Sequence, residues 1–259
     1  MTRVYRARPA EARDAPAAYA VKLLREELEN DPRAVALLRR EALVGKTVAH
    51  PHLVSVLASC TSQPPYFLVM PWLEGTSLAE VLARCRRLEA RTAFWIARQT
   101  AEALAALSAN TWMHGDVKPE NLIVSPEGHV TLVDLGFARR TDQREAVDGD
   151  ALMGTCAYMA PEAISSLRTD SRSDLYSLGV MLFEMLAGRR PFESDDPEEL
   201  SARHRGAKPP ELGDFVAGLS PDACRLVREL LAKEPLRRPQ AGEVVARLIG
   251  LEIAALSFS

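Results

Sequence analysis

Residues 112–140 read WMHGDVKPENLIVSPEGHVTLVDLGFARR. Two apolar runs, at 122–124 and 130–133, flank the turn at 125–128, SPEG, and this pattern predicts a β-hairpin. Because antiparallel pairing brings the start of one strand beside the end of the next, we expect four polar residues to converge at one edge of the hairpin: Asp116, Lys118, Asn121 and Asp134. Carboxylates and an amide beside an amine predict a site for Mg²⁺ and a phosphate.

The same stretch resembles two protein kinase motifs. HGDVKPEN at 114–121 resembles the catalytic loop H-R-D-x-x-x-x-N, and DLG at 134–136 resembles the magnesium motif D-F-G. The lysine two residues after Asp116 is typical of serine/threonine kinases. The two motifs occur in the expected order and at hairpin spacing. Without the rest of the chain, the alternative interpretation is a polar turn in an ordinary α/β domain.

A second set of motifs lies in the first third of the chain. YAVK at 19–22 resembles the V-A-I-K strand whose lysine holds the α- and β-phosphates, although Lys22 alone could be an edge lysine facing water. The helical pattern at 31–46 contains Glu41, our candidate partner for Lys22. The alternatives fall too soon after the strand; they are Glu26, Glu27 and Glu29.

FLVMPWLEG at 67–75 resembles the hinge between the two kinase lobes, with Met70 as gatekeeper. Strands are predicted at 54–60 and 66–70. Pro71 has no N–H, so we expect the donor near Leu73 to bond adenine. The resemblance implies that adenine lies between three apolar side chains, those of Val4, Ala20 and Ile123.

The chain after residue 76 is mostly helical in pattern, with helices predicted at 77–86, 90–110, 174–186, 197–205, 220–233 and 240–250. APE at 160–162 resembles the kinase A-P-E motif. By resemblance, Gly154 and Thr155 receive the substrate residue, and Arg238 pairs with Glu162. Asp174 is expected to cap its helix and to brace the catalytic loop.

Bulk composition excludes several classes of partner. A net charge of −3 over 259 residues gives no reason to expect nucleic acid or an anionic membrane. The four cysteines are scattered without a C-x-x-C pair, which favours a reducing, cytoplasmic location. The N-terminus lacks an apolar signal sequence, and the apolar run at the C-terminus is too short to span a membrane. The sequence leaves the oligomeric state open.

The predicted fold is α+β and kinase-like, one domain over 1–259 with two lobes. A small strand-rich lobe (1–70) joins a larger helical lobe (76–259) through a hinge (71–75). The resemblance is to bacterial eukaryotic-like serine/threonine kinases, which implies transfer of the γ-phosphate of Mg-ATP to Ser and Thr hydroxyls of protein substrates. It implies that Asp116 accepts the proton, Lys118 neutralises the γ-phosphate, and Asn121 and Asp134 hold magnesium.

Three positions depart from the family pattern. Val4 stands where the Gly-rich loop ends, and the rest of that loop is absent, so we expect a truncated N-terminal lobe without its first strand and with an exposed edge. A pseudokinase, serving as a nucleotide-binding or scaffold module, is the alternative. Gly115 replaces the arginine that meets a phosphate on the activation segment, so a phosphorylated Thr141 or Thr155 would lack this partner. Leu135 replaces phenylalanine and is expected to pack in the same place.

Overall fold

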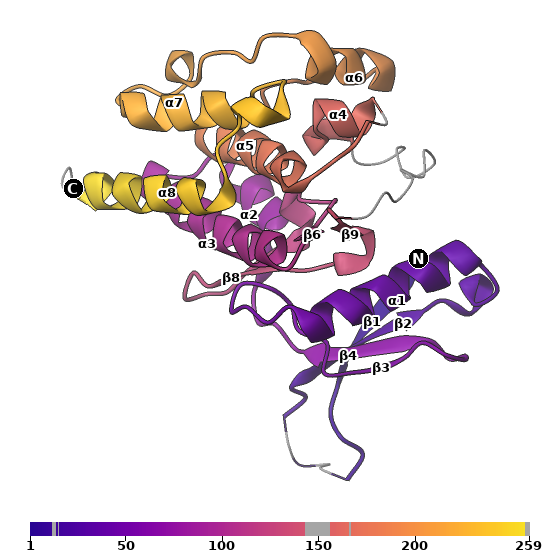
Figure 1. Ribbon diagram of the computed structural model, residues 1–259. Helices are drawn as coiled ribbons and strands as arrows, with labels where there is room; N and C mark the ends of the chain where they lie inside the picture. Colours follow the sequence, from indigo (N-terminus) through magenta and orange to yellow (C-terminus); the bar gives the residue numbers. More distant parts are fainter. Residues whose placement is uncertain (12–13, 15, 143–155, 166, 257–259) are drawn as a thin grey trace.

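The N-terminal lobe is an antiparallel sheet of four strands covered by one helix (Figure 1). The computed structural model describes residues 1–11, 14, 16–142, 156–165 and 167–256. In β2, the side chains of Ala20, Lys22 and Leu24 are buried while their neighbours are half-buried, because alternate residues face opposite sides of a sheet. In spatial order the strands are β1 (Thr2–Ala7), β2 (Tyr19–Leu24), β4 (Phe67–Pro71) and β3 (Ala58–Cys60).

The helix on this sheet is α1 (Pro32–Thr47), as the pattern at 31–46 predicted. The Asp31 side chain accepts a hydrogen bond from the Arg33 amide at 2.9 Å, and Pro32 occupies the first helical position. Both features favour a helix start, since they satisfy or remove donors that have no partner within the helix. The buried face of α1 includes Glu41.

A short connection after α1 joins the two lobes. The Leu132 amide donates to the His52 carbonyl at 2.9 Å, and the Val54 amide donates to the Leu132 carbonyl at 3.0 Å. The strand predicted at 54–60 is therefore wrong in its first half. The Val54 amide bonds to the other lobe and the Val56 amide to Gly45, so the predicted strand is reduced to β3, which pairs with β4.

The C-terminal lobe is helical and encloses α5 (Ser171–Ala187), which is buried along nearly its whole length as predicted. Its N-cap is Asp170, whose side chain accepts from the Arg172 amide at 2.8 Å, so the expectation that Asp174 caps this helix is wrong. The other helices are α2 (Leu78–Cys85), α3 (Ala90–Ala109), α4 (Pro161–Ile164), α6 (Pro197–Gly206), α7 (Pro221–Leu230) and α8 (Ala241–Leu256).

The predicted hairpin is present at the lobe junction. Strands β7 (Leu122–Val124) and β8 (Val130–Leu132) pair with Leu122 opposite Leu132, and Gly128 takes a φ of +83° in the turn, where a side chain would be strained. Strand β5 (Thr76–Ser77) pairs with β7, and β6 (Trp112–Met113) with β9 (Arg139–Arg140). Short 3₁₀ turns are η1 (Glu26–Leu28), η2 (Pro119–Asn121), η3 (Leu135–Phe137), η5 (Cys156–Tyr158), η6 (Leu212–Asp214) and η7 (Pro235–Arg237).

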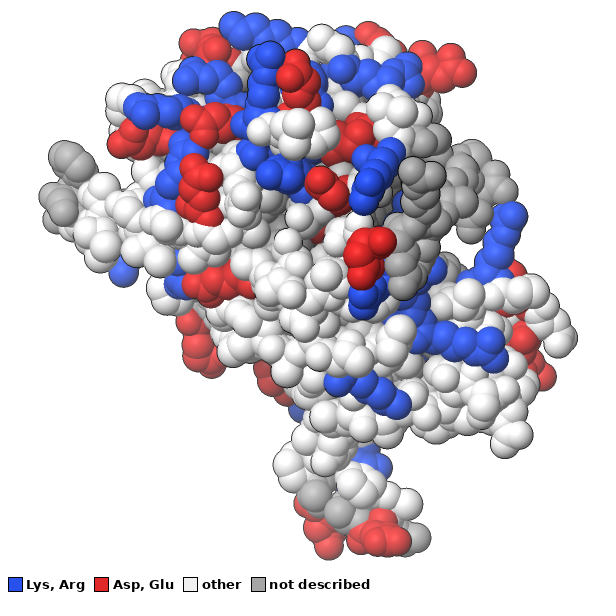
Figure 2. Space-filling model, in the orientation of Figure 1, with Lys and Arg blue, Asp and Glu red and all other residues white. Residues whose placement is uncertain are grey.

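The surface carries charges of both signs. On the face in Figure 2, basic and acidic side chains are intermixed over the helical lobe, in agreement with the small net charge. Among the described residues, no helix combines the length and the apolar character that crossing a bilayer requires.

Candidate active site

Three charged side chains meet between the lobes. The Lys22 amine lies 2.7 and 2.9 Å from the two carboxylate oxygens of Glu41 and 2.8 Å from Oδ1 of Asp134. They come from β2, from the buried face of α1 and from the end of β8. The structure thus brings Lys22 to Glu41, and not to the earlier glutamates in or beside η1, which lie outside the helix.

The pKa shifts show that the charges of Lys22 and Asp134 stabilise each other, whereas burial raises the pKa of Glu41 in spite of Lys22. Burial by itself lowers the pKa of Lys22, but the carboxylates of Glu41 and Asp134 outweigh it, so the net pKa is raised. Burial raises the pKa of Asp134, but Lys22, with smaller contributions from His114 and Lys118, outweighs burial, so the net pKa is lowered. At neutral pH the amine is therefore protonated and Asp134 is ionised.

Asp134 occupies an unusual backbone conformation. Its φ of 67° and ψ of 69° are left-handed, a region that aspartate tolerates better than most residues. This turn directs the chain from β8 into η3. Leu135 follows and is fully buried.

The catalytic-loop residues lie together on the other side of the hairpin edge. The amine of Lys118 is 2.7 Å from Oδ2 of Asp116. The side-chain nitrogen of Asn121 donates to the same carboxylate at 2.9 Å and to the Asp116 carbonyl at 2.8 Å. The Val133 amide donates to the Asn121 carbonyl at 2.9 Å, which joins this group to the segment that carries Asp134.

The buried carboxylate of Asp174 on α5 holds the catalytic loop in place. Asp174 accepts hydrogen bonds from the amides of His114 at 2.6 Å and Gly115 at 2.9 Å. The brace expected of Asp174 is therefore present. His114 adds two contacts that the sequence reading did not assign: Nδ1 accepts from the Asp116 amide at 3.2 Å, and Nε2 lies 3.1 Å from the Val133 carbonyl. The position of His114 in the catalytic-loop motif was the sequence signal that could have identified it as part of the site.

The backbone requires glycine at position 115, where the family motif has arginine. Its φ is +81°, and a Cβ built there would lie 2.5 Å from the Phe137 carbonyl oxygen, closer than such contacts occur. A side chain at this position is thus excluded by both torsion and space. Thr141 lies beyond β9 and donates to the Thr111 carbonyl at 3.2 Å, whereas Gly154 and Thr155 lie outside the described residues.

The five residues expected around adenine are not equally enclosed. Ala20 and Met70 lie opposite each other in the sheet, and both are buried. Leu73 and Ile123 are half-buried, and Val4 on β1 is 57% exposed. The Trp72 amide donates to the Ala18 carbonyl at 2.8 Å, while the Leu73 amide has no backbone acceptor within the described part of the chain.

The donor set fits magnesium bound with a nucleotide. No cluster of three or more His, Cys, Asp or Glu side chains in the described ranges could hold a metal ion alone. Mg²⁺ in nucleotide sites needs only one or two protein oxygens, because phosphates and waters supply the rest. Asp134 offers an ionised carboxylate, and Asn121 uses its side-chain nitrogen for Asp116, which leaves its oxygen as the ligand atom.

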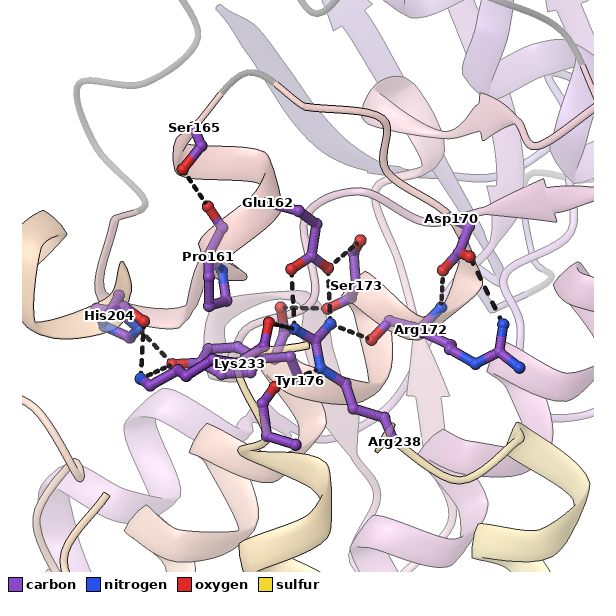
Figure 3. Close-up of polar contacts among 12 residues, drawn as sticks. Pro161, Glu162, Ser165, Asp170, Arg172, Ser173, Tyr176, His204, Lys233 and Arg238 are labelled. Atoms are coloured by element: carbon purple, nitrogen blue, oxygen red, sulfur yellow. Dashed lines mark hydrogen bonds and ion pairs between the residues drawn. The ribbon is translucent and has the colours of Figure 1, made fainter. Parts of the chain in front are cut away.

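A buried ion pair joins α4 to the segment after η7 (Figure 3). The Arg238 guanidinium, fully buried, contacts the two carboxylate oxygens of Glu162 at 2.6 and 2.8 Å, so the predicted pair is confirmed. The Ser173 hydroxyl donates to Glu162 at 2.7 Å. Burial raises the pKa of Glu162, but Arg238 and Ser173 outweigh it, and the net pKa is lowered.

Comparison with known proteins identifies the family. The protein kinase domain family matches residues 2–248. The chain is 34% identical over 228 residues to the serine/threonine-protein kinase PknA of Mycobacterium tuberculosis, and 31% identical over 230 residues to the probable serine/threonine-protein kinase pknA2 of Bifidobacterium longum. It is 28% identical over 224 residues to the serine/threonine-protein kinase PrkC of Bacillus subtilis. The chain therefore belongs to the protein kinase domain family.

The aligned regions cover most of this chain but a smaller part of each relative. They span 86% of the chain and 52% of PknA, 88% and 30% for pknA2, and 86% and 35% for PrkC. The chain thus corresponds to the kinase domain of these longer proteins.

Proposed function

We propose that this chain is a serine/threonine protein kinase domain that transfers the γ-phosphate of Mg-ATP to hydroxyl groups of protein substrates. The observation that carries the proposal is the buried Lys22 amine held by Glu41 and adjacent to Asp134. A lysine fixed in this way presents one positive charge where the α- and β-phosphates lie in the family. The relatives named as serine/threonine kinases support the same activity.

Asp116 is the proposed proton acceptor for the substrate hydroxyl. Lys118, 2.7 Å from it, is the cation placed to neutralise the transferring phosphate. Asn121 holds the Asp116 carboxylate through its side-chain nitrogen, so it orients the base as well as offering a ligand oxygen. Phosphoryl transfer needs little covalent help from the protein, and positioned charges of this kind supply most of the rate enhancement.

Asn121 and Asp134 would hold Mg²⁺, which would neutralise the charge of the phosphates. Asp134 forms an ion pair with Lys22. A nucleotide phosphate placed between them would bind the Lys22 amine in place of the Asp134 carboxylate. Val4, Ala20 and Ile123 are proposed to enclose adenine, with Met70 and Leu73 at the hinge. We also propose a cytoplasmic location, because none of the four cysteines forms a disulfide in the described chain.

The proposal is tested by transfer of labelled γ-phosphate from Mg-ATP to the chain itself and to a generic basic protein. Asp116→Asn should reduce incorporation by about 10²-fold or more, because the proton acceptor is lost. Glu127→Gln, in the exposed hairpin turn, is the matched control and should retain full incorporation. Equal incorporation by the wild type and Asp116→Asn would overturn the assignment.

A pseudokinase is the second candidate, and the 57% exposure of Val4 favours it, because the outer side of the proposed adenine slot is open. Nucleotide binding by the wild type with no transfer in either assay would support this alternative. A chain that binds no nucleotide would support a scaffold role.

A further inference from the structure

The outer strand of the N-terminal sheet carries an arginine on the same face as the proposed adenine residues. Arg6 on β1 lies opposite Ala20 on β2, and Ala20 lies opposite Met70 on β4. Residues directly opposite in antiparallel strands share a face of the sheet. Arg6 is therefore on the same face as the proposed adenine residues, in the row at the hinge end. Val4 lies one row further along the same face, opposite Lys22.

The Arg6 guanidinium makes three contacts outside its own strand. Nη2 donates to Oε1 of Glu74 at 2.7 Å, and Nε donates to the Ala17 carbonyl at 2.8 Å. The guanidinium carbon lies 4.9 Å from the centre of the Trp72 ring. Trp72 and Glu74 belong to the hinge, whereas Ala17 belongs to the connection between β1 and β2. One side chain thus joins the edge strand to the hinge.

Each contact alone is weak, because Arg6 and Glu74 are 48% and 66% exposed in their side chains. The three contacts are made by one guanidinium, so the entropic cost of ordering the Arg6 side chain is incurred only once for all three. The geometry also requires arginine. Two separate N–H directions reach Glu74 and Ala17 while the flat face meets Trp72, and a lysine amine cannot provide this combination.

Strand β1 depends on this link more than a central strand would. It pairs with β2 on one side and is the edge of the sheet. It also carries Val4, the residue proposed to cover adenine. An edge strand has a hydrogen-bonding partner on one side only, so it opens more readily than a central strand. A contact that holds its hinge end therefore limits how far Val4 moves away from Ala20.

We propose that Arg6 is a positioning residue for nucleotide binding, which holds β1 and Val4 over the adenine slot by linking them to the hinge. This inference rests on the proposed kinase function. The groups proposed to act on the transferring phosphate, Asp116 and Lys118, are attached to the other lobe. Loss of the link should therefore weaken nucleotide affinity and leave the rate at saturating ATP unchanged.

The test uses the full 259-residue chain and four variants: Arg6→Ala, Arg6→Lys, Glu74→Gln and the double variant Arg6→Ala/Glu74→Gln. Arg3→Ala is the matched control, since Arg3 is on the same strand, opposite Leu23 on the other face. Three quantities are measured: the dissociation constant of a fluorescent ATP analogue with Mg²⁺, and kcat and KM for ATP. Hydrogen exchange of the β1 amides without nucleotide tests the link independently of any activity.

Arg6→Ala should raise the dissociation constant and KM by about threefold to tenfold, with kcat unchanged and faster exchange in β1. The double variant should bind nucleotide no more weakly than Arg6→Ala. Arg6→Lys should lose less affinity than Arg6→Ala, and Arg3→Ala should have the affinity of the wild type. Unchanged affinity and exchange in Arg6→Ala, or additive effects of the two single variants, would overturn the inference alone. If the wild type binds no nucleotide, the proposed function fails, and the inference fails with it.

Discussion

Glu41 is one of several glutamates near Lys22 in the sequence, and it alone lies on the buried face of α1 with both oxygens at the amine. Glu41→Gln removes the charge that holds Lys22 toward the phosphates. We expect phosphate transfer to fall on the order of 10²-fold, because a fixed electrostatic contact of this kind supplies several kcal/mol. Glu27→Gln in η1 should show the wild-type rate. A comparable loss in both variants would show that Glu41 has no special role.

Gly115 allows a prediction about stability. Gly115→Ala introduces a Cβ 2.5 Å from the Phe137 carbonyl at a φ of +81°. The fold should lose about 1–3 kcal/mol, since a left-handed non-glycine residue and the clash both raise its free energy. Gly242→Ala is the control, because nothing lies within 4 Å of its added Cβ. Thermal unfolding of the two variants gives the comparison, and equal midpoints would contradict the strain argument.

Residue identities in the site could be predicted from motifs, and their contacts only in part. Spacing after the lysine strand was sufficient to select Glu41. The assignment of a cap to Asp174 failed because the helix begins earlier, at Ser171, with Asp170 as its N-cap. Asp174 lies inside the first turn, where its carboxylate reaches the catalytic loop instead. When the start of a helix shifts by one turn, a different acidic residue becomes its N-cap. The sequence pattern does not determine helix starts to that accuracy.

At the scale of elements, α4 is attached to α5 and to the segment after η7 through Glu162 and Arg238 (Figure 3). Because the pKa of Glu162 is lowered in the folded chain, its contribution to stability is present above the ordinary glutamate pKa and is lost as pH falls through the lowered value. Glu162→Gln should reduce the free energy of unfolding by about 3 kcal/mol at pH 7, since a buried guanidinium loses its countercharge.

The measurement is chemical unfolding of the wild type and Glu162→Gln between pH 3 and pH 7, and the difference between them should shrink at the acidic end. Arg237→Ala is the matched control, because Arg237 pairs with Glu234 on the surface, and it should change stability by less than about 1 kcal/mol. A difference that does not depend on pH would show that packing, and not the charge of Glu162, is responsible.

Helices were predicted from sequence more accurately than strands. The long helical patterns of α1, α3 and α5 place these helices within a few residues of their observed bounds. The strand predicted at 54–60 was too long because Val54 and Val56 are apolar for another reason: both are buried at the junction with β8 and α1. Apolar periodicity reports burial, and it does not report which chain accepts the backbone hydrogen bonds.

For the whole molecule, a nucleotide between the lobes would bind groups from both. With Mg-ATP at about 100 times its dissociation constant, the folded state gains about 2.7 kcal/mol, which is roughly a 5–10 °C rise in unfolding midpoint for a domain of this size. Lys22→Met should abolish the rise, because the phosphates lose their cation. Lys46→Met, on the exposed side of α1 where the lysine bonds Ser59, should retain it. An equal rise in both variants would contradict the placement of the phosphates.

The two-lobed arrangement could be predicted from the order of the motifs alone. The links between the lobes could not, because they join residues far apart in sequence through backbone groups and exposed side chains. The bonds between His52 and Leu132 and the contact of Arg6 with the hinge have no local signature. Each depends on how the sheet and the hairpin meet in the folded chain.

The bonds that attach residues 52–54 to β8 have a mechanical consequence for α1. These bonds hold the C-terminal end of the helix in place, so we expect any displacement of α1 to be a rotation about that end and not a slide. At 1.5 Å per residue, Glu41 is roughly 9 Å from Thr47, and a turn of about 20° would move it about 3 Å, enough to break its contact with Lys22. The Pro32 end travels about 8 Å in the same turn. A partner that displaces the Pro32 end would therefore move Glu41 by a smaller distance in the same direction.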